Sequence, residues 1–349
     1  MSDISLNSYR IPAEWEKHHA IWLAWPHDKI TFGSLNQQSG HPDEGRLAKV
    51  EREFIKIITT LAESEQVNLI ILPGKKISDL PKGVKIFEAD YADVWTRDYM
   101  PTFVKNQNDE LTAVKWEYNA YGEKFAGLKK DNNVWSKINL EFDINTIKTG
   151  IILETGAIEV NGNGVLITTL QCLLKRNPNL NKKDYEEIFA KFLNIKKVVW
   201  LKEGLTNDHT DGHVDNIVKF VTPNKILSAY ENNREDENYE ILKNNFETLK
   251  NAINPDGKPF EIVKLPMPHM NYNNGKKTPV SYANFYIGNT VVLVPIFNDA
   301  NDSVALEIIQ SCFPERKIIG IDCREIIYGG GSIHCITQQQ PVGLAKNKK

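Results

Sequence analysis

The sequence is poor in cysteine and lacks the marks of secreted, membrane and nucleic-acid-binding proteins. Its four cysteines include no CxxC pair and fit neither a zinc ribbon nor a disulfide scaffold. No run approaches the roughly 18 apolar residues that a membrane-spanning helix needs, and the N-terminal segment has no apolar stretch of a secretory signal. Basic residues are not in excess, with 42 Lys and Arg against 45 Asp and Glu. These absences argue against nucleic-acid and membrane partners and predict a cytoplasmic protein whose thiols stay reduced.

No linker rich in proline, glycine or serine divides the 349 residues, and a unit of hairpin, helix and strand recurs instead. Three copies are complete, with hairpins at 157–169, 216–231 and 282–295, helices at 182–194, 236–252 and 303–312, and strands at 197–202, 261–266 and 317–322. Their turn markers Gly164, Lys225 and Thr290 are 61 and 65 residues apart. Two further copies are indicated upstream, by a hairpin at 101–116 and by the series of strand 20–26, helix 44–63 and strand 67–72.

Self-similarity at this period favours a repeat or propeller-like α/β architecture over two unlike domains. Hairpins also argue against a doubly wound parallel sheet, whose strands are joined by helical crossovers. The alternative is the ordinary alternation of strands and helices found in any α/β protein. We expect residues 1–345 to form one closed catalytic domain and residues 346–349 to be a basic tail.

The segment GGGSIHCITQQQP, residues 329–341, combines a glycine run with a cysteine. Gly330 and Gly331 would let the backbone approach a ligand closely. A lone cysteine in an apolar strand is more often inert core than nucleophile. The glycines and the three glutamines that flank Cys335 are typical of the border of a site, which favours a reactive thiol.

The segment NDHTDGHVDN gathers two histidines and two aspartates within seven residues, namely His209, Asp211, His213 and Asp215. Histidines at i and i+4 resemble a zincin-like metal site, although Gly212 and the missing glutamate argue against it. In a strand, His213 and Asp215 would share one face. A third interpretation is a polar turn whose side chains cap the backbone.

Two more segments carry acids beside apolar or aromatic residues. In DVWTRDYMP, Asp98 follows Trp95 and Arg97, where a simple ion pair is the alternative to a site. Glu154 ends an apolar run and therefore needs a cationic partner.

All of these segments lie at or just before the first strand of a repeat. In a closed ring such positions meet near the axis, which places five side chains around one cavity: Asp98, Glu154, His213, Asp215 and Cys335. Carboxylates suit a planar guanidinium with several N–H donors, while a thiolate can attack its central carbon and a histidine can move protons.

The chain resembles the agmatine deiminase and bacterial (Porphyromonas-type) peptidylarginine deiminase family of the guanidine-modifying, or pentein, superfamily. The resemblance spans nearly the whole chain and rests on four ordered segments: IPAEWEKHHAIWLAWPH (11–27), VWTRD (94–98), TDGHVDN (210–216) and GGGSIHCITQQQP (329–341). It implies a five-bladed pseudo-symmetric α/β propeller with one ββαβ-like unit per blade.

The resemblance also implies the chemistry. Cys335 would be the nucleophile, His213 the general acid and base, and Asp98, Glu154 and Asp215 the ligands of the guanidinium or of His213. Agmatine would become N-carbamoylputrescine and ammonia, a step of putrescine and polyamine biosynthesis, through an amidino-cysteine intermediate. No cofactor and no metal are expected, and a homodimer is compatible with the resemblance.

The far end of the substrate is less well defined by the sequence. We expect Trp95, Asp211, Gly330 and Gly331 to contact the substrate, although Trp95 also suits a plain core position. The chain departs from the family pattern at His209, where some agmatine-specific members carry a carboxylate, and at Thr155, where many have glycine. Deimination of arginine or peptidyl-arginine is one alternative, and a metal-dependent hydrolase that uses His209 and His213 is another.

Overall fold

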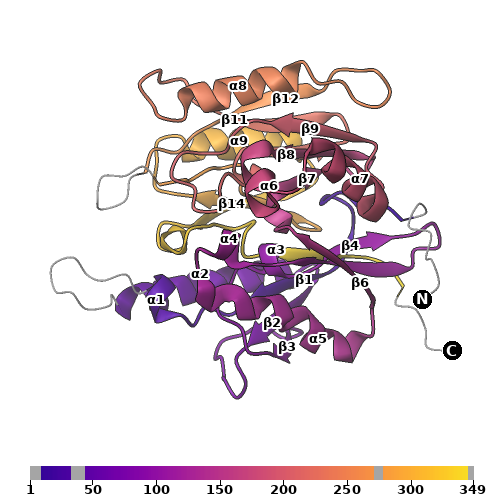
Figure 1. The fold of residues 1–349 in the computed structure, drawn as a ribbon. Helices are drawn as coiled ribbons and strands as arrows, with labels where there is room; N and C mark the ends of the chain where they lie inside the picture. Colours follow the sequence, from indigo (N-terminus) through magenta and orange to yellow (C-terminus); the bar gives the residue numbers. More distant parts are fainter. Residues whose placement is uncertain (1–8, 33–43, 271–277, 345–349) are drawn as a thin grey trace.

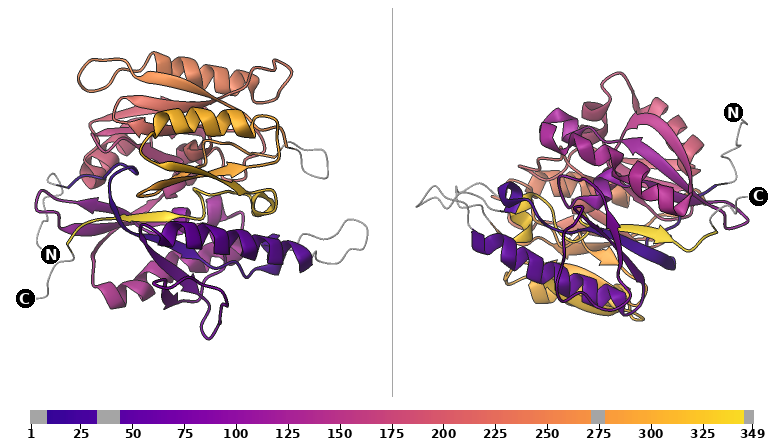
Figure 2. Two further views of the ribbon diagram at one scale, coloured as in Figure 1. Left: turned by 180° about the vertical axis from the view of Figure 1, so that it is seen from behind. Right: turned by 90° about the horizontal axis from the view of Figure 1, so that it is seen from below.

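The structure, a computed structural model, describes residues 9–32, 44–270 and 278–344. It is a mixed α/β fold in which the strands of these ranges form five small sheets and most of the longer helices lie on the outside (Figures 1 and 2). The sheet orders are β16-β1-β2-β3, β4-β5-β6, β7-β8-β9, β10-β11-β12 and β13-β14-β15.

Four of the sheets are built from consecutive strands in the same way. The first two strands pair antiparallel, and the third pairs parallel with the second after a helical crossover. The strands are β4 (Thr102–Lys105), β5 (Leu111–Glu117), β6 (Asn145–Ile152), β7 (Ile158–Val160), β8 (Val165–Thr169), β9 (Lys197–Leu201), β10 (Val218–Thr222), β11 (Lys225–Tyr230), β12 (Glu261–Pro266), β13 (Tyr286–Ile287), β14 (Val291–Ile296) and β15 (Lys317–Asp322). The crossover helices are α5 (Val134–Phe142), α6 (Leu170–Arg176), α7 (Lys182–Leu193), α8 (Tyr239–Lys250) and α9 (Asp302–Cys312).

The remaining sheet joins the two ends of the described chain. Three of its strands are β1 (His18–Ala24), β2 (Gln66–Ile71) and β3 (Lys85–Glu88). The helices α1 (Lys29–Phe32) and α2 (Glu44–Ala62) lie between β1 and β2 in the chain. The last strand, β16 (Gln338–Pro341), pairs antiparallel with β1 and places Gln338 opposite Trp22. This sheet therefore repeats the order of the others, with its first strand supplied from the far end of the sequence and with β3 added as a fourth strand, parallel to β2.

The predicted repeat is present in the described residues. Each predicted hairpin, helix and strand has a counterpart whose ends differ by a few residues. The hairpin expected from 282 is shorter, because residues 281–284 form a turn and β13 has only two residues. The sequence patterns did not indicate β3, α5, β6, α6 or the pairing of β16.

Local chemistry explains how a typical crossover helix forms. α7 begins with a capping box in which Asn181 and Asp184 each accept a backbone N–H of the other, and it ends at Asn194 in a left-handed conformation. Its Tyr185 and Phe189 are buried on one face, against the β7-β8-β9 sheet. The helix is thus fixed at both ends and along one side, which holds its sheet as a rigid unit.

A short helical turn precedes the first strand of several sheets. α3 (Thr96–Tyr99) precedes β4, η3 (Thr155–Ala157) precedes β7, and η4 (Val214–Asn216) precedes β10. Irregular turns at 281–284 and 333–336 occupy the same place before β13 and β16. The other short helices are α4 (Ala120–Glu123), η2 (Ala126–Asn133) and η5 (Ile326–Gly329). These turns carry the chemistry described below.

The helices in the described ranges are too short or too polar to cross a membrane. The tail predicted at 346–349 lies outside the described residues, and the single domain predicted over 1–345 stays a prediction.

Candidate active site

Three of the turns meet at Gly156, which has no side chain to fill the space between them. A Cβ atom on Gly156 would lie 2.7 Å from Nδ1 of His213, 2.8 Å from Oδ1 of Asp98 and 3.1 Å from Oδ2 of Asp215. Cys335 joins the same group, because its Sγ lies 3.7 Å from Oδ2 of Asp215. The structure therefore brings together four predicted site residues from the turns before β4, β10 and β16, and the glycine, in the turn before β7, leaves a hollow between them.

His213 is buried between two carboxylates but makes no hydrogen bond through its ring. Its Nδ1 lies 3.8 Å from Asp98 and its Nε2 lies 3.5 Å from Glu154. Within the described part of the chain, neither nitrogen has a hydrogen-bond partner, although the side chain is only 1% exposed. Burial disfavours the imidazolium, but Asp98, the Cys172 thiol and Glu154 outweigh it and raise the pKa of His213 well above its usual value. A charged histidine in this place can give a proton to a leaving group.

Asp98 is held by two donors. The phenol of Tyr121 donates to its Oδ2 at 2.8 Å, and the backbone N–H of Gly156 donates to its Oδ1 at 3.2 Å. Burial raises the pKa of Asp98 to about 6, with Asp215 and Glu154 adding to it and His213 opposing. The two donors thus orient the carboxyl toward the hollow. A cation that enters the hollow would lower the pKa of Asp98 and favour its ionised form.

Glu154 meets the cationic partner that its burial requires. The Nε of Arg176, in α6, donates to both carboxylate oxygens at 2.8 Å, and neither side chain is exposed. Burial would raise the pKa of Glu154, but His213 and Arg176 lower it below its usual range. Glu154 is therefore a carboxylate that faces His213 on one side and Arg176 on the other.

Asp211, which is predicted to contact a substrate, lies among three cations. Its oxygens lie 2.6 Å from Nζ of Lys124, 2.8 Å from Nζ of Lys175 and 2.7 Å from Arg176. These cations hold its pKa far below its usual range, against the effect of burial. Asp211 therefore braces Arg176, and its contact with a substrate stays a prediction.

The Cys335 thiol is enclosed by an amide and an acid. Nδ2 of Asn284, in the turn before β13, lies 3.2 Å from Sγ. Burial, together with Asp215 and Asp98, raises the pKa of Cys335 well above its usual value. The free site thus favours the neutral thiol, and a cation bound in the hollow would favour the thiolate.

A buried polar network holds Asp215 from behind. Nδ1 of His334 lies 2.8 Å from Oδ2 of Asp215, and its Nε2 lies 2.9 Å from Oε2 of Glu14. The same glutamate accepts from Nζ of Lys219 at 2.8 Å and from the backbone of Ile287. His334 lowers the pKa of Asp215 although burial opposes this, so the carboxylate stays ionised and fixed.

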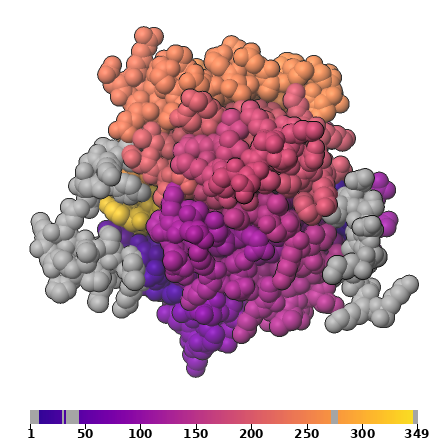
Figure 3. All heavy atoms as spheres, viewed as in Figure 1, coloured from indigo at the N-terminus to yellow at the C-terminus, as the bar shows by residue number. Residues whose placement is uncertain are grey.

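The hollow lies beside a cavity of about 660 Å³ that opens to the surface. Its walls carry two acids and several rings, namely Asp28, Asp93, Trp95, Tyr121, Phe125 and His209. Gly330 and Gly331 pack tightly here, since a Cβ on the first would meet the ring of His209 and one on the second would meet Trp95 and Cys335. In Figure 3, a yellow segment from the C-terminal part of the chain is exposed beside the indigo N-terminal and the purple segments.

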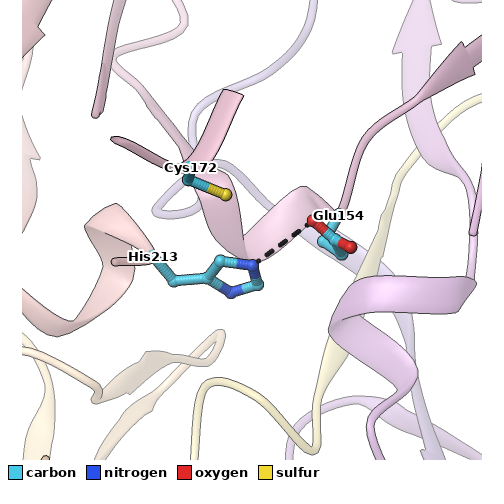
Figure 4. A group of neighbouring side chains, drawn as sticks. All are labelled: Glu154, Cys172 and His213. Atoms are coloured by element: carbon cyan, nitrogen blue, oxygen red, sulfur yellow. Dashed lines mark ion pairs between the residues drawn. The ribbon is translucent and has the colours of Figure 1, made fainter. Parts of the chain in front are cut away.

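The residues of the alternative metal site are not gathered at one point. The His209 ring packs between Tyr121 and Phe125, and Asp211 is engaged by three cations. His213 is instead grouped with Glu154 and Cys172, whose ligand atoms lie within 4.8 Å of one another (Figure 4). The donor set at which a metal could bind thus differs from the one that the spacing of the histidines suggested.

Several residues of the site were missed by sequence reasoning: Cys172, Arg176, Asn284, His334 and Tyr121. Asn284 could have been found, because it lies just before the first strand of a predicted repeat, as the other site residues do. His334 adjoins Cys335 in the same segment, which could have drawn attention to it. The other three lie in crossover segments, where no pattern links them to the site.

Comparison with known proteins gives one consistent result. Residues 10–341 match the family of Porphyromonas-type peptidyl-arginine deiminases. A protein of Marinomonas sp. (strain MWYL1), provisionally named an agmatine deiminase, is 36% identical over 96% of this chain and 95% of its own. Among solved structures, the agmatine deiminase of Enterococcus faecalis has a TM-score of 0.87 and 29% identity over 97% of both chains.

A second solved structure carries a substrate. A cysteine-to-serine variant of the agmatine deiminase of C. jejuni, with substrate bound, has a TM-score of 0.85 and 30% identity over 96% of this chain and 97% of its own. The chain therefore belongs to the agmatine deiminase and Porphyromonas-type peptidyl-arginine deiminase family of the guanidine-modifying, or pentein, superfamily.

Proposed function

We propose that this protein is an agmatine deiminase, which hydrolyses the guanidinium of agmatine to N-carbamoylputrescine and ammonia. The observation that carries the proposal is the hollow at Gly156, where two aspartates, a histidine and a thiol converge within contact distance of one absent side chain. A planar guanidinium has N–H donors for the carboxylates and an electrophilic carbon for the thiol.

The first half of the reaction forms a covalent intermediate. The Cys335 thiolate adds to the central guanidinium carbon, and a C–N π pair moves onto nitrogen. His213, charged before reaction, gives its proton to the departing nitrogen, which leaves as ammonia. An amidino-thioether on Cys335 remains.

The second half returns the enzyme to its starting state. Neutral His213 takes a proton from water, and the hydroxide adds to the amidino carbon. The C–S bond then breaks and the thiolate is restored, while the hydroxyl proton passes through solvent to the released ammonia and the neutral ureido product leaves. Asp98 and Asp215 hold the planar nitrogens in both halves, and Glu154 orients His213 and favours the return of its proton.

The substrate itself activates the nucleophile. Burial and two carboxylates hold the free Cys335 as a thiol, so a guanidinium bound between them adds the positive charge that favours the thiolate. Ionised sulfur would then arise where a substrate is present, which protects the free enzyme from oxidation.

The cavity beside the hollow favours an amine tail over a carboxylate tail. Its lining, within the described residues, includes the acids Asp28 and Asp93 and no lysine or arginine. Arginine would bring a carboxylate toward Asp28 and toward Asp93, whose pKa burial raises to about 7, whereas agmatine brings an ammonium that can favour the ionised form of Asp93. Trp95 forms part of this wall, where its indole can pack on the methylene chain.

We further propose that the five sheets are the blades of a five-bladed propeller and that residues 1–345 form one catalytic domain. The repeated strand order and the convergence of the pre-strand turns support this. A cytoplasmic setting fits a nucleophile that must stay reduced. The homodimer remains a prediction.

Ureido-product formation from agmatine, arginine and a blocked arginine peptide tests the function. We expect agmatine to give the highest kcat/KM and Cys335→Ala to lower turnover by at least about 10⁴-fold. Cys312→Ala, at a half-buried cysteine in α9, is the matched control and should behave as the unchanged protein. A preference for the peptide, or full activity in Cys335→Ala, would refute the proposal.

A further inference from the structure

We propose that Glu154, Cys172 and His213 form a binding site for a divalent cation of the Zn²⁺ type, and that metal bound there blocks the proposed deiminase. Glu154 directly precedes η3, Cys172 lies in α6 and His213 directly precedes η4. All three side chains are buried. Figure 4 shows the Cys172 sulfur and the Glu154 carboxylate on the same side of the His213 ring. The blocking effect rests on the proposed function, whereas the binding does not.

The distances suit one small cation. In a tetrahedral zinc site with bonds of 2.0–2.3 Å, any two ligand atoms are roughly 3.3–3.8 Å apart. Nε2 of His213 and Oε2 of Glu154 already lie 3.5 Å apart, and all three ligand atoms lie within 4.8 Å of one another. Binding therefore requires a shift of the Cys172 side chain by an ångström or so, not a change of fold.

Two of the three donors are weakly engaged by the protein. Nε2 of His213 has no hydrogen-bond partner among the described residues, although it is buried. Sγ of Cys172 makes a long contact of 3.6 Å to the carbonyl oxygen of Thr210. A buried nitrogen whose contact with the Glu154 carboxylate is as long as 3.5 Å and which lies beside a thiol is an arrangement that a metal ion would satisfy.

The set of donors selects the metal. Sulfur, nitrogen and oxygen together suit Zn²⁺ and its close relatives, whereas Mg²⁺ and Ca²⁺ prefer oxygen ligands. Three protein ligands leave a fourth position for water. Zinc binding takes up the thiolate and the neutral imidazole, so the protons of Cys172 and His213 are released to solvent.

The Arg176 guanidinium is the main charge opposed to a cation here. It lies 2.8 Å from the Glu154 oxygens, but Asp211 also neutralises it. Asp98 and Asp215 add two further acids close to His213. A carboxylate has about four lone-pair positions, so Glu154 can accept from Arg176 and still bind a metal.

Metal at this site would stop the reaction through His213. Its Nε2 lone pair would be bound to the cation, so the ring could neither give a proton to the departing nitrogen nor take one from water. Cys172 is absent from the atoms closest to Gly156, where the guanidinium would lie. Inhibition by a metal bound at Cys172 would therefore differ from inhibition by a metal bound directly to the nucleophile Cys335.

Cobalt binding to the full-length Cys335→Ala protein tests the site without any need for activity. We expect one Co²⁺ per chain, with a sulfur-to-cobalt charge-transfer band in the near ultraviolet and tetrahedral d–d bands. The band should vanish in Cys172→Ala/Cys335→Ala and in Cys172→Ser/Cys335→Ala, each confirmed to be folded by circular dichroism. Cys323→Ala/Cys335→Ala, which removes another buried cysteine, is the control and should keep it.

Zinc inhibition of the active protein supplies the second readout. We expect removal of Cys172 to raise the Zn²⁺ concentration for half-inhibition at least tenfold relative to Cys323→Ala, with each variant compared with its own rate in chelator. A cobalt–sulfur band that persists without Cys172, or that requires Cys335, would overturn the site. A band that behaves as expected in a protein without deiminase activity would sustain the site and refute only the proposed function.

Discussion

Two buried histidines near Asp215 have opposite surroundings. His334 has a carboxylate at each ring nitrogen, Asp215 at 2.8 Å and Glu14 at 2.9 Å. His213 has carboxylates no closer than 3.5 Å and no hydrogen-bond partner within the described residues. Both side chains are almost fully buried.

This contrast separates support from reaction. A buried polar group without a partner costs free energy, and a fold retains it where a ligand completes the bonding. The region around His213 is incomplete, because its ring nitrogens have no hydrogen-bond partner within the described residues, and a hollow lies beside it. The region around His334 is complete, and its network of Glu14 and Lys219 fixes the carboxylate that faces the hollow. Four substitutions separate the two regions further.

His213→Gln should have the largest effect on turnover. Loss of the proposed acid and base should lower kcat by about 10³–10⁴-fold. Because its raised pKa means that the charged ring stabilises the fold between Asp98 and Glu154, we expect the melting temperature to fall as well, but by less than in His334→Gln, whose contacts are shorter, as followed by circular dichroism. His269→Gln changes a half-exposed histidine and is the control. If His213→Gln unfolds the protein, the ring is a structural group and the contrast fails.

Gly156→Ala should have the second largest effect. Its Cβ would enter the hollow within 3 Å of His213 and Asp98, so we expect kcat/KM for agmatine to fall by roughly 10²-fold or more through lost space for the guanidinium. Gly320→Ala in β15 also adds a tight Cβ contact, here to the flexible Ile296, and should keep normal kinetics. Normal kinetics in Gly156→Ala would show that the substrate does not occupy the hollow.

His334→Gln should affect both stability and turnover. Breaking a buried pair costs about 3 kcal/mol, and a less firmly held Asp215 should lower kcat about 10–100-fold with less effect on KM. His18→Gln breaks a similar buried contact, to Glu65 and Tyr286, and should lose stability while keeping kcat. Equal kcat losses in the two variants would mean that His334 acts only through stability and does not position Asp215.

The same contrast explains what the sequence could and could not predict. Asp98, His213, Asp215 and Cys335 were found because each lies at a fixed place in a repeated unit, and the repeat follows from hydrophobic periods and turns. The partners that satisfy the site obey no such rule. Arg176 reaches Glu154 from a crossover helix, and β16 returns from the far end of the chain to pair with β1. Those contacts depend on packing between units, which local patterns do not encode.

Glu159→Gln should have the smallest effect, a change in how stability depends on pH. Glu159 lies in the complete region, accepts the backbone N–H of Phe220 and is 3.7 Å from Nζ of Lys219. Burial raises its pKa to about 7, with Glu14 adding to it and Lys219 and Arg97 opposing.

The sign of this pH effect follows from the raised pKa. The folded state keeps the Glu159 proton up to about pH 7, whereas the unfolded chain loses it near pH 4.5. The contribution of Glu159 to stability is therefore full below pH 4.5 and is lost as the pH rises toward 7, by about 3 kcal/mol in total. Urea unfolding at pH 5 and pH 8 should show a smaller decrease in Glu159→Gln than in the unchanged protein, while Glu240→Gln, at an exposed site, should decrease as much as the latter. Parallel decreases in all three proteins would mean that Glu159 is ionised throughout and that Lys219, not a bound proton, completes this region.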